Sequence, residues 1–245
     1  DFKGARTLKA DKNTATVSKL DGGTQVHLRV RSIGSKGEFS AWATPITATT
    51  TVPETDPVRV ASYNIVCHSC GKAPWSTRRI PVASLIAEQN PDVVGVQEAQ
   101  QSRPKGFNVS QFDDLVRALA QTGADYRVTD RAIGASKGTR ILYKPSTMTL
   151  LKTGAIRYSR QSGGATSRYA AWAILRQRST GREMVFFSTH LEPKSYSVRL
   201  AQSRQLAASI AGIAGKRPVV AVGDFNASQF HYYAVHQAMT GAGLV

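Results

Sequence analysis

The chain has 245 residues, of which 41% are hydrophobic and 20% charged, a composition typical of folded proteins and not of disordered ones. It holds 32 lysine and arginine residues against 16 aspartate and glutamate residues, so its formal net charge is +16. It has no run of about eighteen apolar residues, which excludes a membrane-spanning helix, and its length favours two domains.

The first segment, 1–50, shows the alternation of polar and apolar residues that is typical of short β-strands. Val26, Leu28 and Val30 would share one face of such a strand, with polar side chains on the other. Glycine-rich turns flank it. We therefore predict strands at 14–17, 24–31 and 44–51.

This segment resembles the C-terminal half of a fibronectin type III module. The matching stretches are Leu20–Thr24, Val26–Val30, Ser40–Trp42 and Pro45–Thr49. Gly22 stands where that family usually has proline, and Val26 where it usually has the corner tyrosine. The resemblance implies a partial β-sandwich module that acts as a spacer or weak adhesion element. A generic β-hairpin is the alternative.

A linker is predicted at 51–57, because Pro53 and Pro57 disfavour both helix and central strand. The first 57 residues carry 8 basic and 6 acidic side chains, so 58–245 carries 24 basic and 10 acidic ones, a net charge of +14. This excess indicates a polyanionic partner such as nucleic acid or a phospholipid surface. A merely solubilising surface is the alternative.

From Val58 onward the pattern is one of strands alternating with helices, which predicts an α/β domain over 58–245. The first helix would be capped by Ser76 or Thr77, and Gly123 would close the second. The predicted strands are 58–66, 92–98, 139–143, 170–175, 184–189 and 219–223, and the predicted helices are 77–89, 110–122 and 196–214.

Cys67 and Cys70 are the two cysteines, in a CxxC spacing. A zinc site would need two more ligands, and no second CxxC or HxxxH follows. A redox pair of the thioredoxin type would open a helix, whereas this pair follows a strand and enters a loop. A local disulfide in an exported protein is the interpretation we favour, with two inert thiols as the alternative.

Polar side chains interrupt the α/β pattern at the ends of predicted strands. Burying such groups without partners costs several kcal/mol. They are therefore unusual in a core strand. Each has an ordinary explanation alone, such as a turn asparagine or a satisfied core histidine, but five strand ends together indicate a site. The residues are Asn64, Glu98, His190, Asp224 and Asn226.

These residues fall in four motifs that resemble those of the endonuclease/exonuclease/phosphatase superfamily, in the family's order. The motifs are Ser62-Tyr-Asn-Ile65, Pro91-Asp-Val-Val-Gly-Val-Gln-Glu98, Ser188-Thr-His-Leu-Glu192 and Gly223-Asp-Phe-Asn226. The family includes pancreatic-type deoxyribonuclease, abasic-site endonucleases, bacterial sphingomyelinases and inositol-polyphosphate phosphatases. The resemblance implies a four-layered α/β sandwich, in which two mixed sheets are flanked by helices.

The resemblance also implies roles. Glu98 would bind Mg²⁺, with Mn²⁺ or Ca²⁺ as alternatives, and Asn64 would support the metal and touch the phosphate. Asp224 would orient or deprotonate the attacking water, and Asn226 would bond a phosphoryl oxygen. His190 would contact the scissile phosphate and stabilise its charge or assist the leaving group.

Arg168 lies where some members of the family have a phosphate-binding arginine, although a surface arginine is an equally good interpretation. The family's last motif, Ser-Asp-His, does not occur in this sequence, and neither does the Asp that pairs with its histidine. His231 and His236 lie too close to Asn226 to replace it, so we predict that they are surface residues. A catalytic domain incomplete at its C-terminus, with weak or no activity, is the expectation.

Three functional hypotheses follow. The first is a secreted or cell-surface metal-dependent nuclease, which the charge of 58–245 and the intact motifs support. The second is a phosphatase or phospholipase C-like enzyme acting on lipid or inositol phosphates. The third is a non-catalytic polyanion-binding or adhesion protein, against which retention of Glu98, His190, Asp224 and Asn226 argues. The oligomeric state is not predicted.

Overall fold

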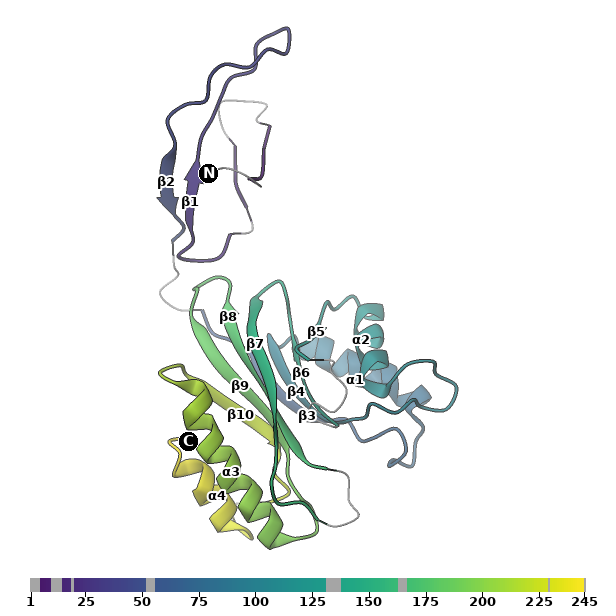
Figure 1. Cartoon of the computed structure of the whole chain (residues 1–245). Helices are drawn as coiled ribbons and strands as arrows, with labels where there is room; N and C mark the ends of the chain where they lie inside the picture. The colour runs from purple at the N-terminus through teal and green to yellow at the C-terminus, as the bar shows by residue number, and fades with distance from the viewer. Residues whose placement is uncertain are drawn as a thin grey trace. The chain divides into compact units, whose positions relative to one another are not determined.

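The computed structural model describes residues 5–9, 15–18, 20–51, 56–130, 138–162, 167–228 and 230–244. The chain forms two compact units, each described separately below (Figure 1). The first comprises Asp1–Thr55 with Arg178–Gly181, and the second comprises Asp56–Gln177 with Arg182–Val245.

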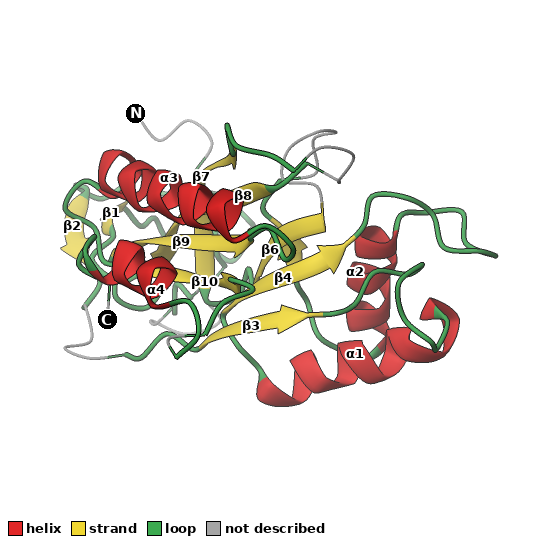
Figure 2. Ribbon diagram, turned by 90° about the horizontal axis from the view of Figure 1, so that it is seen from below, coloured by secondary structure: helices red, strands yellow, loops and turns green. Residues whose placement is uncertain are grey.

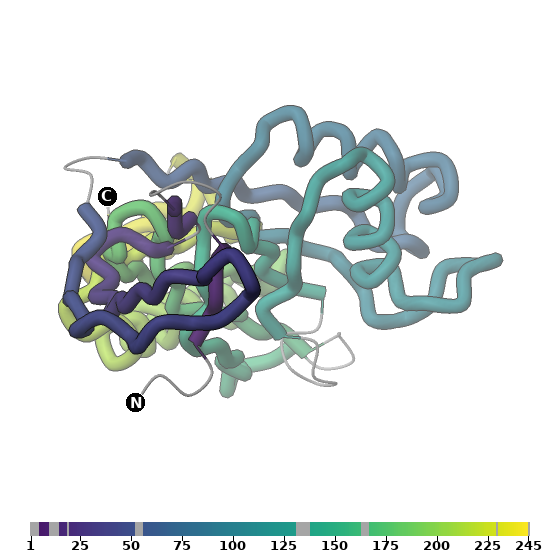
Figure 3. Tube along the Cα trace, turned by 90° about the horizontal axis from the view of Figure 1, so that it is seen from above, coloured from purple at the N-terminus to yellow at the C-terminus, as the bar shows by residue number. Residues whose placement is uncertain are grey.

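The first unit contains an antiparallel hairpin of β1 (Gln25–Leu28) and β2 (Ile46–Thr49), whose arms run side by side in Figure 3. Both strands are shorter than predicted, and 15–18 forms no strand. Residue 14 of the predicted first strand lies outside the described residues. Because no second sheet is present in the described part of this unit, the fibronectin type III resemblance stays a prediction.

Two mixed sheets form the centre of the second unit, as the family resemblance implies. One has the order β3-β4-β6-β5, with β3 and β4 parallel and the other pairs antiparallel; the second has the order β10-β9-β8-β7, with β9 and β10 parallel. The strands are β3 (Val60–Asn64), β4 (Val93–Ala99), β5 (Arg127–Val128), β6 (Gly138–Tyr143), β7 (Met148–Arg157), β8 (Tyr169–Gln177), β9 (Glu183–His190) and β10 (Val219–Asp224).

Helices cover the outer face of each sheet, which completes the four-layered sandwich (Figure 2). On the first sheet, α1 (Trp75–Gln89) and α2 (Gln111–Gln121) bury residues such as Ile86 and Leu115 against Val94 and Val96. On the second, α3 (Tyr196–Ala214) and α4 (Tyr233–Thr240) pack against the opposite face. Period-two alternation explains this layering, because neighbouring residues of a strand face opposite layers.

A third apolar cluster fills the space between the two sheets. It joins Val93 and Ile141 from the first sheet to Leu175 and Phe186 from the second. Toward the carboxyl ends of β4 and β9 this layer becomes polar, because Gln97 and Ser188 take inward positions and their side chains hydrogen-bond at 3.2 Å. The layer between the sheets therefore has an apolar end and a polar end.

The helix ends differ in part from the prediction. α1 begins at Trp75, after Pro74, so the predicted cap at Ser76 or Thr77 is wrong. The Trp75 indole anchors this earlier start by donating to Asp114 Oδ2 at 2.8 Å. α2 begins and ends one residue inside the predicted 110–122, with Ser110 as its N-cap, and α3 has the predicted bounds.

The elements that sequence analysis did not predict are β5, β7 and α4. β7 lies at the edge of its sheet, where only one side needs a strand partner. α4 is eight residues long. His236 lies within α4 and His231 lies before its first residue, and both are exposed, as predicted for the two histidines. None of the helices built from described residues has the length and apolar character needed to cross a membrane.

Candidate active site

The predicted site residues come together at the carboxyl ends of four strands, the polar end of the layer between the sheets. Asn64 ends β3, and Glu98 is the second-last residue of the neighbouring parallel strand β4. His190 and Asp224 end β9 and β10 and lie opposite each other in the parallel register. Strand direction thus brings residues far apart in sequence to one edge, which is where open α/β sheets commonly bind ligands.

Asn64 joins the two sheets at this edge. Its Nδ2 donates to Glu98 Oε1 at 3.0 Å and to Asp224 Oδ2 at 3.0 Å. Its Oδ1 accepts the Val66 N–H at 3.0 Å, which fixes the orientation of the amide. One amide group therefore holds two carboxylates, from different sheets, close together.

Glu98 occupies an unusual backbone conformation. Its φ is +60°, and the pairing of β4 with β6 shifts register between Gln97 and Ala99, so Glu98 lies in a bulge. A non-glycine residue in this region costs about 1–3 kcal/mol and persists where its surroundings hold it. The bulge turns the half-exposed Glu98 carboxylate into the polar edge, where Oε2 accepts the Cys67 N–H at 2.9 Å.

The turn that presents the Cys67 N–H is held by Arg78 of α1. Its guanidinium donates to the carbonyl oxygens of Ile65 (2.6 Å), Val66 (3.2 Å) and Cys67 (3.2 Å). A side chain with five donors in a fixed plane is suited to holding several carbonyls at once.

Gln111 of α2 also holds this turn. It is 0% exposed, its Nε2 donates to Val66 O at 2.9 Å, and its Oε1 accepts the His68 N–H at 2.9 Å. Sequence analysis missed both Arg78 and Gln111. A basic residue and an amide on predicted helices gave no signal, because their partners are backbone groups of a remote turn.

Cys67 and Cys70 are joined by a disulfide, in agreement with the favoured interpretation of the CxxC. Sγ atoms of both and a carboxylate oxygen of Glu98 lie within 4.8 Å of one another, the one such group of three metal-capable side chains among the described residues. Disulfide sulfurs are not the thiolates that bind soft metals, so this group is not a thiolate metal site.

His190 lies beside Asp224, with 3.8 Å between His190 Nε2 and Asp224 Oδ2. Burial lowers the pKa of His190 and the positive charge of Arg168 lowers it further, although the carboxylates of Asp224, Glu98 and Glu192 act in the opposite direction. The net shift favours the neutral imidazole, which can donate or accept a hydrogen bond.

Asn226 follows Asp224 in a left-handed conformation, with φ of +49°. Its N–H donates to Asp224 Oδ1 at 2.9 Å, and its Nδ2 donates to Leu191 O at 2.9 Å. Asn226 therefore ties the end of β10 to the end of β9 and orients the Asp224 carboxylate. Its predicted bond to a phosphoryl oxygen stays a prediction.

Arg168, just before β8, interacts electrostatically with the carboxylates of the site. Burial lowers the pKa of Arg168, and the negative charges of Glu192, Glu98 and Asp224 oppose that shift. Its Nε is buried and has no hydrogen-bond partner among the described residues. Arg168 is half-buried and lies within electrostatic range of these carboxylates, and its binding to phosphate stays a prediction. Glu192, whose Oε1 accepts the Lys194 N–H at 2.9 Å, was not predicted as a site residue.

The oxygen donors of this cluster fit a hard divalent cation. Two carboxylates, Glu98 and Asp224, converge on one neutral amide, an arrangement whose negative charge a cation would offset. Mg²⁺ is typically held by one or two protein carboxylates, with water and phosphate oxygens completing its octahedron. Glu98 meets that requirement as a single carboxylate ligand, while Asn64 supports it indirectly, because the Asn64 amide oxygen is turned to the Val66 N–H and its amide nitrogen holds the carboxylate.

Comparisons with known proteins agree with this architecture. A family model described as the Endonuclease/Exonuclease/phosphatase family matches residues 61–242, most of the chain. No curated protein shows significant sequence similarity to the chain.

Solved structures show the same fold at low identity. The mannosyl-6-phosphatase Bt3783 of Bacteroides thetaiotaomicron VPI-5482 is 23% identical, with a TM-score of 0.62 over 76% of this chain and 71% of that one. The human Nocturnin catalytic domain with bound sulfate anion is 23% identical, with a TM-score of 0.61 over 76% and 70%. TDP2 of D. rerio complexed with single strand DNA product is 16% identical, with a TM-score of 0.56 over 76% and 64%. By its family match and its fold, the chain belongs to the endonuclease/exonuclease/phosphatase family of phosphoester hydrolases.

Proposed function

We propose that the protein is an exported, divalent-metal-dependent phosphodiesterase that hydrolyses nucleic-acid phosphodiester bonds. The observation that carries the proposal is the Asn64 amide, which holds Glu98 and Asp224 together at the joint carboxyl end of two sheets. This arrangement can hold a cation and a water-activating carboxylate side by side, as hydrolysis of an anionic ester requires.

Glu98 would hold Mg²⁺, with Mn²⁺ or Ca²⁺ as alternatives, and Asn64 would support the metal by holding the Glu98 carboxylate in place. The bound ion would supply positive charge against the charge that develops on the phosphoryl and leaving oxygens. Cys67 contributes by keeping Glu98 in place through its N–H.

Asp224 would align the attacking water and accept its proton. Its Oδ1 is held by the Asn226 N–H, which restricts the carboxylate to one orientation. His190, in its neutral form, would donate a hydrogen bond to the scissile phosphate from the neighbouring strand end. Arg168 would add a positive charge on the side of Glu192. Asn226 would direct its amide toward a phosphoryl oxygen.

Nucleic acid is the favoured substrate because segment 58–245 has a net charge of +14, from 24 basic and 10 acidic residues. A surface with this excess attracts polyanions with several phosphates more than it attracts single phosphomonoesters. The similarity to TDP2 complexed with a single strand DNA product supports this choice.

A phosphatase acting on small phosphomonoesters is the second candidate, and the similarity to a mannosyl-6-phosphatase favours it. Phospholipids and inositol phosphates are further substrates to test. Export is proposed from the Cys67–Cys70 disulfide, which is typical of oxidising compartments, and from the fibronectin-like segment 1–50, which would act as a spacer.

The deciding experiment offers plasmid DNA, RNA, sphingomyelin and an inositol polyphosphate side by side to the protein. We expect Mg²⁺-dependent cleavage of nucleic acid that EDTA abolishes. Turnover of the inositol polyphosphate alone, which is a phosphomonoester, would favour the second candidate function over the nuclease. Cleavage that persists in EDTA would contradict the metal requirement.

A further inference from the structure

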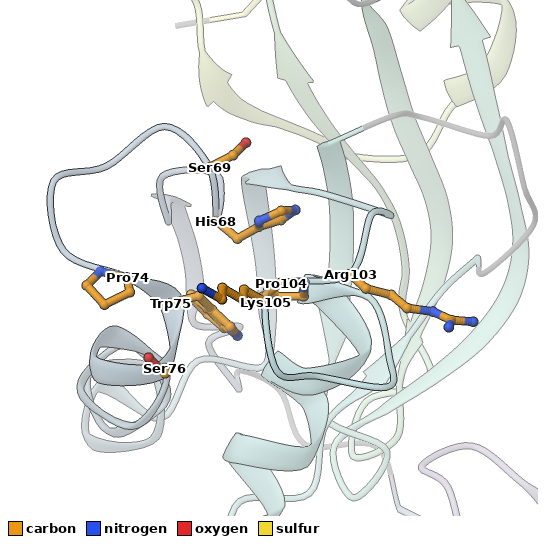
Figure 4. Close-up of a pocket in the computed structure, with 8 residues that line it drawn as sticks. All are labelled: His68, Ser69, Pro74, Trp75, Ser76, Arg103, Pro104 and Lys105. Atoms are coloured by element: carbon orange, nitrogen blue, oxygen red, sulfur yellow. The ribbon is translucent and has the colours of Figure 1, made fainter.

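We propose that a pocket beside the candidate active site binds a second phosphate of the substrate, one that flanks the scissile phosphate along a nucleic-acid strand. This inference rests on the proposed function and makes it more specific. The pocket has a volume of about 440 Å³ and lies at the start of α1 (Figure 4). Its lining residues are His68, Ser69, Pro74, Trp75, Ser76, Arg103, Pro104 and Lys105.

The pocket and the candidate metal site share one short turn. Cys67 donates its N–H to Glu98 Oε2 at 2.9 Å, and the next residue, His68, lines the pocket. The opposite wall comes from the loop that follows β4, the strand that carries Glu98. Both walls therefore continue directly from the residues that form the site.

The walls are held in place by the protein's own contacts. The His68 ring bonds through Nε2 to Ser102 Oγ at 2.7 Å, which joins the two loops. The His68 N–H is held by the buried Gln111 at 2.9 Å. Trp75 is 1% exposed and bonded to Asp114, so it forms a fixed part of the lining. A site whose walls are already ordered loses little conformational entropy when a ligand binds.

The lining favours an anion. Lys105 and Arg103 are exposed cations, and no carboxylate is among the lining residues. In Figure 4 the Lys105 side chain is directed toward the Trp75 side of the pocket, while the Arg103 side chain points the opposite way. Lys105 is therefore the cation best placed to meet a phosphate in this pocket.

The position of the pocket discriminates between substrates. A nucleic-acid strand carries about one phosphate per 3.4 Å of helical rise, so a neighbouring phosphate can lie outside the metal site while the scissile one occupies it. A sugar phosphomonoester has no second phosphate to place there. The pocket thus links the excess positive charge of the chain to a strand-like substrate.

The test measures binding of a fluorescent single-stranded oligonucleotide in EDTA, so that no cleavage occurs, over a series of salt concentrations. Lys105→Ala should weaken binding several-fold at low salt and reduce the slope of log K against log salt by about 0.7, the value of one lost phosphate contact. The matched control is Lys216→Ala, another exposed lysine beyond the end of α3 that does not line the pocket. It should leave the slope unchanged.

A second probe isolates the pocket from the metal site. A dinucleoside monophosphate has one phosphate, so its affinity should be the same for the Lys105→Ala variant and the unmodified protein. A trinucleotide should bind the variant more weakly than the unmodified protein. Equal losses for Lys105→Ala and Lys216→Ala, or no binding of any oligonucleotide, would overturn the pocket assignment. Failure of the proposed function would be seen separately, as metal-independent or absent turnover of a small phosphodiester.

Discussion

The two ends of the layer between the sheets are built by the same strands but serve different purposes. At one end, Val93 begins β4 and Phe186 occupies the middle of β9, and both are fully buried in an apolar cluster. At the other end, Glu98 lies one residue before the end of β4 and His190 ends β9, and these two side chains lie beside Asn64 and Asp224. The apolar end stabilises the fold, and the polar end holds the charged side chains of the candidate site.

This difference indicates that substitutions at the two ends should affect different measurements. Burial of apolar surface stabilises the fold, so changes at the apolar end should lower the free energy of unfolding. Glu98 and Asp224 are like charges held by one amide, so they contribute little net stability. Changes at the polar end should therefore lower metal binding and turnover while leaving the fold intact.

The largest expected effect is at the apolar end. Phe186→Ala should lower the free energy of unfolding by about 3–5 kcal/mol, because it removes a ring that is 0% exposed and leaves a cavity between the sheets. Urea denaturation measures the change. Phe230→Ala is the matched control, since Phe230 is 83% exposed and its removal should cost under about 0.5 kcal/mol. Similar losses for both would contradict the assigned core.

At the polar end, Glu98→Gln should have the opposite profile. Turnover of a small phosphodiester should fall by roughly 10²–10³, and Mn²⁺ affinity, followed by electron paramagnetic resonance, should weaken markedly. The free energy of unfolding should fall by about 1 kcal/mol, far less than for Phe186→Ala, because the isosteric amide can accept from only one of the two donors, Asn64 Nδ2 and the Cys67 N–H, that Glu98 serves. Unchanged Mn²⁺ affinity would refute the metal role of Glu98.

Gln111→Ala should affect both measurements, since Gln111 lies behind the turn that holds Glu98. Loss of the side chain leaves Val66 O and the His68 N–H without this partner, which costs about 1–3 kcal/mol of stability. Mn²⁺ affinity should also fall several-fold under conditions where the variant is fully folded. Gln89→Ala, on the exposed end of α1, is the control. Lost stability with unchanged Mn²⁺ affinity would show a structural role alone.

The smallest effect concerns the surface at the start of β9. Hydrogen bonds from Arg176 and Arg217 lower the pKa of Glu183 in the folded protein. The contribution of Glu183 to the free energy of unfolding is therefore present above the pKa that Glu183 has in the unfolded chain. It is lost as pH falls through the pKa that Glu183 has in the folded protein. It should be under about 1 kcal/mol, because the three side chains are partly exposed. Glu183→Gln should reduce the pH dependence of stability in this acidic range; an unchanged profile would count against the assignment.

Sequence alone determined the α/β pattern and most of the residues at the polar edge. Long apolar runs ending in Glu98, His190 and Asp224 were recognisable because buried strands seldom end in charged groups. The layers on each side of the sheets were implied by the family resemblance of the four motifs, because strands buried on both faces show little alternation. The sequence pattern was weakest at sheet edges and in short elements: β7 is an edge strand and α4 is short, so neither gave a clear pattern.

Only the tertiary structure decided how the site is held. The Asn64 amide between two carboxylates, the positive φ of Glu98, and the turn held by Arg78 and Gln111 depend on contacts between residues remote in sequence. The start of α1 at Trp75 likewise depends on Asp114 of another helix. Local periodicity reports which face of an element is buried, whereas hydrogen bonds to backbone groups of distant turns are set by the packing of complete layers.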